Sequence, residues 1–435
     1  MTTPDRPRAA DPPWSGYGSV VAKAVGLGAF AGVFGVAYLL LIEALTERLW
    51  GEDWAGEGWF SGDIWSFLIP VVAAVLVGLT YKVFHLPARY PGFIDELEEG
   101  EVEPTTAPGA IGIAVLSLVG GASLGPEAPL GTAGGAAGTW LARRTGGSTD
   151  EVRQMSFVGI SGAFGGLTST PVGGPLLAFE LEHDQTHSYY FTNLVPGMIS
   201  GAVAFGIMWP IVGAPFQGLV TIPKGDFHSW MLLAAVGLGV IGGIAALAVG
   251  KLMVLLVGLM RPLDSRPLLR AVVGGMAVGA VGFTLPLTLF SGQTSLPVVV
   301  AEFDSLGICM LLALAVLKTA TLGVSLGAGF YGGPIFPMFF IGAVLGVAVH
   351  VLMPSIPLAL AVGAVMAALG AATALAPLSM SILVAIMMQS GLELFGAVVL
   401  AAATAYAIRV VFSPPSSMSD MKLAASGEPA RSSAI

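Results

Sequence analysis

One carboxylate stands alone in a long apolar stretch of this sequence. Glu127 lies in the run Gly120–Gly131, which reads GGASLGPEAPLG and has apolar residues on both sides. A charged side chain at membrane depth is unfavourable unless it is compensated, so such a residue usually has a function. The glycines and prolines around it indicate irregular backbone followed by the start of a helix, which a membrane protein keeps only inside the protein or along a cavity.

A helix start of this kind presents unpaired backbone N–H groups and roughly half a positive charge. Two such starts aimed at one point make an anion site without Lys or Arg, and the bound anion can still be released. Helix starts marked by Gly and Pro occur at 91–94, 125–131 and 332–338. The Glu127 carboxylate would occupy this kind of site as a tethered anion and leave it when protonated. The stretch therefore predicts a gate or a proton-coupling group; the alternative is a structural cap of the helix start.

The composition is that of a polytopic membrane protein. Of 435 residues, 55% are apolar and 10% are charged, and the mean hydropathy is +0.84. Soluble proteins carry about 25% charged residues. The 60 glycines suit closely packed and broken transmembrane helices. We predict an all-α polytopic membrane protein with many tilted, broken and re-entrant helices.

Two stretches of the chain resemble each other. The run Ser123–Pro129 has a counterpart in Ser325–Pro337, and Gly162-Ala163 has one in Gly370-Ala371. We align the first pair at the serines. Broken apolar segments at corresponding places in two halves indicate inverted-topology repeats with a transport site between them. The predicted parts are a polar N-terminal segment (1–17), a transmembrane domain (18–412) with halves near 18–213 and 229–412, and a disordered C-terminal tail (413–435).

Four motifs, in order along the chain, resemble those of the CLC chloride channels and chloride–proton antiporters. Gly125–Pro129 (GPEAP) resembles the family's G-x-E-G-P motif, and Gly332–Pro337 (GGPIFP) resembles its G-x-F-x-P motif. Gly162–Glu180 and Gly370–Leu378 resemble its glycine- and alanine-rich segments. The resemblance implies an inverted-repeat fold, a homodimer with one pathway in each subunit, anion sites of backbone amides at helix N-termini, and a gating glutamate at Glu127.

The resemblance also assigns the remaining site residues. The predicted anion-binding residues, taken from the three helix starts, are Gly125, Ala128, Pro129, Leu130, Gly131, Ile335, Phe336, Gly92 and Phe93. Pro334 stands where the family has an amide that faces the anion, and proline has no N–H. We therefore expect Ile335 and Phe336 to donate in its place.

Three family features do not align with this sequence. Pro91 stands at the position of the family's anion-binding serine, and Leu181 stands at that of the antiporters' inner proton-transfer glutamate. The family's late tyrosine has no equivalent near 414–419. We therefore predict weak or absent proton coupling. A fully coupled antiporter that uses Glu180 or Glu182 as its inner acid is the alternative.

The predicted function is transport of an inorganic anion, taken to be chloride, through a CLC-like pathway gated by Glu127. Alternatives within transport are a coupled anion/proton antiporter and an exporter of fluoride or another anion. Alternatives of a different class are a non-transporting scaffold and an integral membrane enzyme, and we find no nucleophile or metal set for an enzyme. We expect no cofactor, no metal and no nucleic acid. The expected partners are the anion, protons, lipid and a second copy of the chain.

Basic residues indicate the orientation. Arg6, Arg8 and Lys23 precede or begin the first apolar run, whereas the loop after it is mostly acidic. Because Lys and Arg are enriched on the cytoplasmic side, we expect both termini in the cytoplasm. The predicted location is the plasma (inner) membrane of a bacterial-type cell, with the chain crossing it many times.

Overall fold

The computed structural model describes residues 16–51, 63–84, 86–87, 100–181, 190–222, 227–389 and 391–413. The elements in these ranges are helical, and eight of the described helices are long and apolar enough to cross a membrane. The first half contains α1 (Tyr17–Trp50), α2 (Trp65–Val83), α4 (Ala107–Val119), α5 (Glu127–Arg144), α6 (Thr149–Leu167), α7 (Gly173–Leu181) and α9 (Val195–Val212). The second half contains α10 (Trp230–Met260), α11 (Pro267–Thr284), α12 (Ser295–Ala301), α13 (Ile308–Ala328), α14 (Ile335–Leu352), α15 (Leu358–Ala374), α16 (Pro377–Met387) and α17 (Leu392–Phe412). Short turns of other helix types are η1 (Tyr190–Leu194), η2 (Arg261–Leu263), η3 (Pro286–Thr288) and η4 (Phe303–Ser305).

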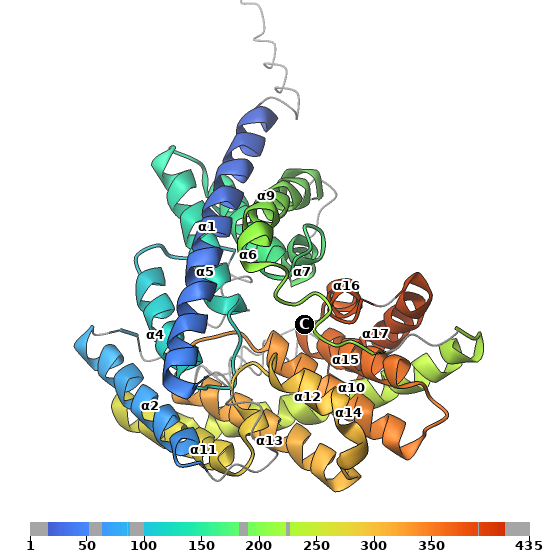
Figure 1. The fold of residues 1–435 in the computed structure, drawn as a ribbon. Helices are drawn as coiled ribbons and strands as arrows, with labels where there is room; N and C mark the ends of the chain where they lie inside the picture. The colour runs from blue at the N-terminus through green and yellow to red at the C-terminus, as the bar shows by residue number, and fades with distance from the viewer. Residues whose placement is uncertain are drawn as a thin grey trace, which may run out of the picture.

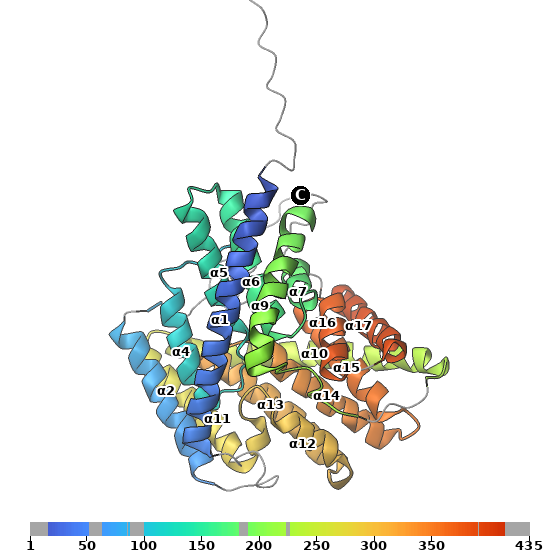
Figure 2. The ribbon, with the colours of Figure 1, turned by 45° about the horizontal axis from the view of Figure 1, so that its top comes forward.

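The two halves repeat the same helix packing (Figure 1). In the first half α6 packs against α1, α5, α7 and α9, and in the second half α15 packs against α10, α14, α16 and α17. Likewise α1 packs along α9 as α10 packs along α17. Helices α2 and α11 lie side by side across the boundary between the halves, as Figures 1 and 2 show. This pattern is the one expected of an internal repeat.

The predicted alignment of the first pair at the serines is wrong. The helix starts at Glu127 and Ile335 are equivalent and lie 208 residues apart, whereas Ser123 and Ser325 lie 202 residues apart. The reason is that α13 continues through Ser325, whereas α4 ends before Ser123. The two serines still meet in space, because the Ser325 hydroxyl accepts a hydrogen bond of 3.3 Å from the Ser123 N–H.

Small residues bring the site helices close to their neighbours. In α5, a Cβ atom added to Gly134 or Gly138 would collide with the backbone of α6. In α14, Gly342 and Gly346 repeat this spacing against the backbone of α15. Pairs of small residues four positions apart allow two helix backbones to approach closely within a membrane. These glycines thus hold α5 close against α6 in the first half and α14 close against α15 in the second half.

The long helix α1 connects two faces of the molecule. Its 34 residues extend for about 50 Å. At its N-terminal end Lys23 forms an ion pair with Glu151 and bonds to the turn after α5. On this face the Arg143 guanidinium also binds Glu103 and holds the pKa of that carboxyl below its usual value. At the other end of α1 the Trp50 indole donates to the last turn of α4 at 2.9 Å. The face at the start of α1 is therefore rich in ion pairs, and α1 ends at the opposite face.

Candidate functional site

Two helix starts meet where the halves join. Helix α5 begins at Glu127 and α14 begins at Ile335, each directly after a Gly-Pro pair. Gly125 and Gly333 form an isolated antiparallel bridge, with N–H to O distances of 2.7 and 2.8 Å in the two directions. Reciprocal bonds of this kind relate the two segments by an approximate two-fold axis. The bridge fixes one helix start from each half beside the other.

At its start, each of these helices has two N–H groups that make no hydrogen bond to a carbonyl of the same helix. The third position is proline in both, Pro129 in α5 and Pro337 in α14, and proline has no N–H. The fourth amide donates back to the carbonyl of the proline before the helix, at 3.2 Å in α5 and 3.0 Å in α14. The first two amides have no backbone carbonyl partner within their helix. They belong to Glu127 and Ala128 in α5 and to Ile335 and Phe336 in α14.

This arrangement narrows the predicted anion-binding set. The Gly125 amide is used by the bridge, Pro129 has none, and the Leu130 amide is bonded within α5. Gly131 lies one residue further into the same helix, where the amide bonds to the preceding turn. The predicted donors whose amides point out of a helix start are Ala128, Ile335 and Phe336. The predicted residues that lie outside the described ranges are Gly92 and Phe93, together with Pro91.

The Glu127 side chain reaches across the interface to the other helix start. Its Oε1 accepts from the Ile335 N–H at 2.8 Å and from the Phe336 N–H at 3.4 Å. The residue is 1% exposed, and Oε2 has no hydrogen-bond partner. A Cβ atom on Gly125 or Gly333 would collide with the carboxylate, so glycine at both positions leaves the space that it fills. We call this arrangement of two amides and two glycines the Glu127 seat.

Two fully buried cationic side chains bind groups other than Glu127. The Lys318 ammonium donates to three consecutive carbonyls, of residues 288–290, at 2.6 to 3.1 Å. The Arg270 guanidinium donates to the Ala328 carbonyl at 3.2 Å and to the Asp264 carboxylate at 2.9 Å. Both act at the carbonyl end of a helical segment, where positive charge is favourable. Among the described residues, no Lys or Arg forms an ion pair with Glu127, and the donors that its carboxyl group receives from α14 are backbone amides.

A cavity of about 640 Å³ extends from the face at which α1 ends to Pro126, beside the seat. We call it the vestibule. Its walls come from the end of α1, the loop before α5, the segment 213–222 after α9, which we call the connector, and the loop after η3. Pro126, the residue before Glu127, is part of the wall, and so are Glu43 and Glu47 of α1. None of the described residues that line it is Lys or Arg.

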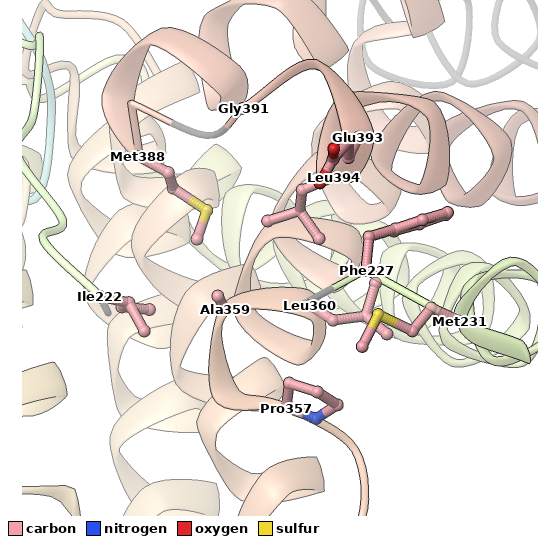
Figure 3. Close-up of a pocket in the computed structure, with 10 residues that line it drawn as sticks. All are labelled: Ile222, Phe227, Met231, Pro357, Ala359, Leu360, Met388, Gly391, Glu393 and Leu394. Atoms are coloured by element: carbon pink, nitrogen blue, oxygen red, sulfur yellow. The ribbon is translucent and has the colours of Figure 1, made fainter. Parts of the chain in front are cut away.

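A second, much smaller cavity lies between the starts of α10, α15 and α17 (Figure 3). Its volume is about 80 Å³, and most of its lining side chains are apolar, including Met231, Leu360 and Leu394. Neither the start of α5 nor the start of α14 contributes a residue to it. This cavity is therefore separate from the Glu127 seat.

Glu180, one of the two candidate inner acids, also binds a helix start. Near the end of α7, its Oε1 accepts from the Leu378 N–H at 2.9 Å. Its Oε2 accepts from the N–H and the hydroxyl of Ser379, at 2.8 and 2.5 Å. These donors belong to the first turn of α16, so Glu180 caps that helix from the other half. The other candidate, Glu182, lies outside the described residues.

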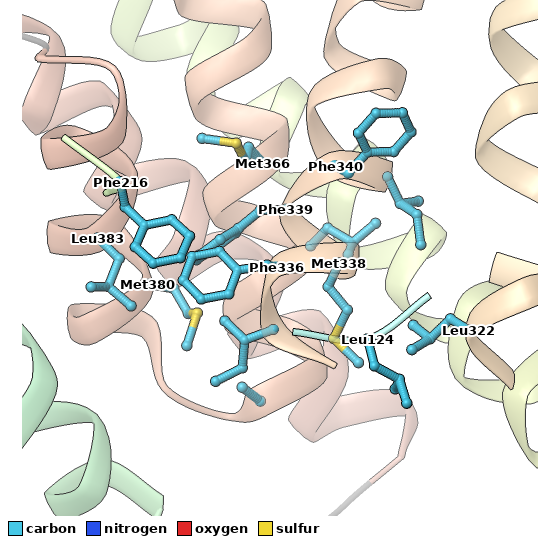
Figure 4. Packing of buried hydrophobic residues seen from close by; sticks show 14 of the residues in the cluster. Leu124, Phe216, Leu322, Phe336, Met338, Phe339, Phe340, Met366, Met380 and Leu383 are labelled. Carbon is cyan, nitrogen blue, oxygen red and sulfur yellow. The ribbon is translucent and has the colours of Figure 1, made fainter. Parts of the chain in front are cut away.

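Two aromatic residues at the site were missed by the sequence analysis. Phe216, in the connector after α9, stacks on Phe336 with 3.7 Å between ring centroids and 11° between ring planes (Figure 4). Tyr331, just before α14, shares a hydroxyl hydrogen bond of 2.7 Å with Thr132 of α5. Phe216 belongs to no motif identified in the sequence, and Tyr331 lies in the run Ser325–Pro337 without a role assigned to it. Both contacts join segments that are far apart in sequence, so no local pattern could have identified them.

Comparison with known proteins assigns the chain to a family. A family described as voltage gated chloride channel matches residues 73–409. YfeO of Escherichia fergusonii, whose name marks it provisionally as an ion-transport protein, is 26% identical over 348 residues, which cover 78% of this chain and 81% of YfeO. YfeO of Escherichia coli is 28% identical over 305 residues, or 68% of this chain and 71% of YfeO.

Solved structures share the fold. A slow cyanobacterial Cl⁻/H⁺ antiporter superposes with a TM-score of 0.79 at 18% identity, over 96% of this chain and 99% of the antiporter. A CLC-type fluoride/proton antiporter superposes with a TM-score of 0.75 at 17% identity, over 92% of this chain and 98% of that protein. These matches confirm the predicted all-helical polytopic fold. The chain is therefore a multi-pass membrane transport protein of the voltage-gated chloride channel (CLC) family, and not an enzyme.

Proposed function

We propose that the chain carries chloride along a path through the Glu127 seat, with Glu127 as the gate and the proton-binding group. The observation that carries this proposal is the 2.8 Å bond from the Ile335 N–H to Oε1 of Glu127. A carboxyl oxygen already occupies a helix start of the other half, where the free amides and the helix dipole favour negative charge. A free anion of similar charge would find the same donors once the carboxylate leaves.

Exchange of the carboxylate for an anion follows from the same geometry. Protonation of Glu127 removes the charge that strengthens its bonds to Ile335 and Phe336, so the side chain is released more readily. An anion that enters from the vestibule can then bind these two amides, with the Glu127 and Ala128 amides of α5 facing it across the bridge. Because backbone dipoles rather than a full cation hold the anion, binding remains weak enough for release.

We further propose that proton coupling is weak or absent. Both oxygens of Glu180 are bonded to the first turn of α16, so passing a proton through this carboxylate would break a helix cap. A coupled antiporter is the second candidate. The observation that favours it is the fold shared with a Cl⁻/H⁺ antiporter and a fluoride/proton antiporter. Fluoride is accordingly the second candidate anion.

The assembly and orientation belong to the same proposal. We place the face with Lys23 and Arg143 in the cytoplasm, because basic residues gather on that side of a membrane. The vestibule then opens on the outer face of a bacterial-type plasma membrane, and both termini are cytoplasmic. We also propose a homodimer with one pathway in each subunit, as the family resemblance implies.

Anion efflux from proteoliposomes tests this function. Purified protein would be reconstituted into liposomes loaded with chloride, fluoride or nitrate. Anion efflux would be followed while a pH electrode records proton movement. We expect chloride efflux with little accompanying proton uptake. Stoichiometric proton uptake against the anion gradient would replace the uncoupled mechanism with the antiporter. Absence of flux for all three anions would contradict the transport proposal and favour a scaffold.

A further inference from the structure

The connector between the halves makes direct contact with the second helix start. It follows α9, and its Phe216 is 2% exposed although it lies in a segment with no helix of its own. Its ring lies flat on that of Phe336, at 3.7 Å between centroids, as Figure 4 shows. Phe336 is the second residue of α14, and its amide is one of the two that hold Glu127. The connector therefore packs directly on a residue of the Glu127 seat.

Backbone bonds hold the connector in this position. The Gly218 N–H donates to the Ile386 carbonyl at 3.2 Å, and the Val220 N–H donates to the Met387 carbonyl at 3.1 Å. Both carbonyls belong to the last two residues of α16, and the Ile386 carbonyl also accepts from the Gln389 N–H at 3.2 Å. The connector is thus bonded to the end of one helix of the second half, while its Phe216 ring packs on the start of another.

The same segment also forms a wall of the vestibule. Pro215 and Leu219, which flank Phe216 on either side, line the cavity, whereas Phe216 itself is turned toward Phe336. Pro126, directly before Glu127, lines the same cavity. The stacked rings therefore lie between connector residues that face the vestibule and the amides that face Glu127.

We propose that Phe216 is a positioning residue for the anion site and that its connector is the hydrophobic lid between the vestibule and the Glu127 seat. This inference rests on the proposed function. Through Phe336, the ring sets the place of the second amide, whose bond to Glu127 is the longer of the two at 3.4 Å. Stacked aromatic pairs contribute beyond their buried area, so loss of the ring weakens anion binding by about three- to tenfold.

Flux measurements separate positioning from general stability. Phe216→Ala removes the ring, Phe216→Tyr keeps it, and Val220→Ala is the matched control because Val220 is fully buried in the same connector but does not stack on Phe336. We expect Phe216→Ala to raise the KM for chloride by about three- to tenfold, Phe216→Tyr to restore it, and Val220→Ala to leave it unchanged. Equal effects of Phe216→Ala and Val220→Ala, or an unchanged KM in Phe216→Ala, would overturn the positioning role.

A labelling experiment tests the lid without requiring transport. Cys309 is the single cysteine of the chain, so Glu127→Cys in a Cys309→Ser background places one thiol in the seat. We expect a charged methanethiosulfonate reagent to modify this thiol several-fold faster when Phe216→Ala is added, and no faster with Val220→Ala. An unchanged rate with Phe216→Ala would overturn the lid even if the protein transports chloride. Absence of flux in the wild-type protein together with the faster rate would instead contradict the proposed function alone.

Discussion

Glu127 and Glu180 are two carboxylates of the first half that both bind a helix start of the second half. Glu180 uses both oxygens and receives three bonds of 2.5 to 2.9 Å from the first turn of α16. Glu127 uses only Oε1, receives bonds of 2.8 and 3.4 Å from α14, and leaves Oε2 without a partner although the residue is 1% exposed. The more deeply buried carboxylate is thus the less completely bonded one.

This difference distinguishes a cap from a gate. A carboxylate with every oxygen bonded to a helix start is a stabilising group, because its removal leaves several donors unsatisfied. A buried carboxylate with an unbonded oxygen, next to a cavity, is held less firmly and can be exchanged for another anion. The same residue type at the same kind of site thus serves stability at Glu180 and, we propose, transport at Glu127.

Glu127→Gln is expected to have the largest effect. The amide side chain is neutral, so it loses the charge-assisted bonds to Ile335 and Phe336 and competes poorly with a free anion for the seat. Chloride efflux at neutral pH should rise roughly ten- to hundredfold. This factor corresponds to the free energy that a hydrogen bond to a charged group contributes, about 1.5 to 3 kcal/mol. Efflux rates from proteoliposomes at equal protein content measure this. A rate equal to that of wild type would place Glu127 with Glu180 among the structural caps.

Glu180→Ala is expected to lower stability and leave gating intact. Loss of the cap should reduce the free energy of unfolding by about 2 kcal/mol, because two backbone amides and one hydroxyl lose an ionised acceptor. Thermal unfolding in detergent measures the loss, and Glu180→Gln, which keeps acceptor oxygen, is the control with the smaller loss. A Glu180→Gln variant with normal stability and abolished proton movement would make Glu180 an inner acid instead.

Gly333→Ala tests whether the space in the seat matters. Its added Cβ would collide with the Glu127 carboxylate and displace it, so the variant should reproduce part of the Glu127→Gln effect, about a threefold to tenfold rise in efflux. Gly112→Ala is the matched control, since a Cβ there meets no atom within 4 Å. Equal rates for both variants would show that the carboxylate does not need this space.

Glu43→Gln with Glu47→Gln is expected to have the smallest effect. Both residues are exposed and line the vestibule, where two negative charges oppose an entering anion. At about 10 Å in water each charge contributes about 0.4 kcal/mol before screening, so entry should rise about twofold at low salt and little at high salt. Glu302→Gln with Asp304→Asn, two exposed acids that do not line the vestibule, is the control pair. A salt-independent change would contradict an electrostatic effect.

The comparison also shows what sequence alone could reveal. Glu127 was identifiable because a single charge in an apolar run is improbable, and Ile335 and Phe336 because proline cannot donate. The role of Glu180 was not identifiable, since its partner Ser379 lies 199 residues away and only the fold brings them together. The same holds for Phe216, whose partner belongs to the other half. The repeat was detected but misaligned at Ser123, because where α13 ends depends on packing rather than on a local signal.

The pH profile of chloride efflux tests the central claim most directly. Wild type, Glu127→Gln and Glu180→Gln would be measured in proteoliposomes across the acid to neutral range, with the pH equal on both sides. The account predicts that efflux of wild type and of Glu180→Gln rises as pH falls, because protonation of Glu127 opens the seat, and that Glu127→Gln is flat and already high. A Glu127→Gln profile that keeps the wild-type pH dependence would contradict the assignment of Glu127 as the gate.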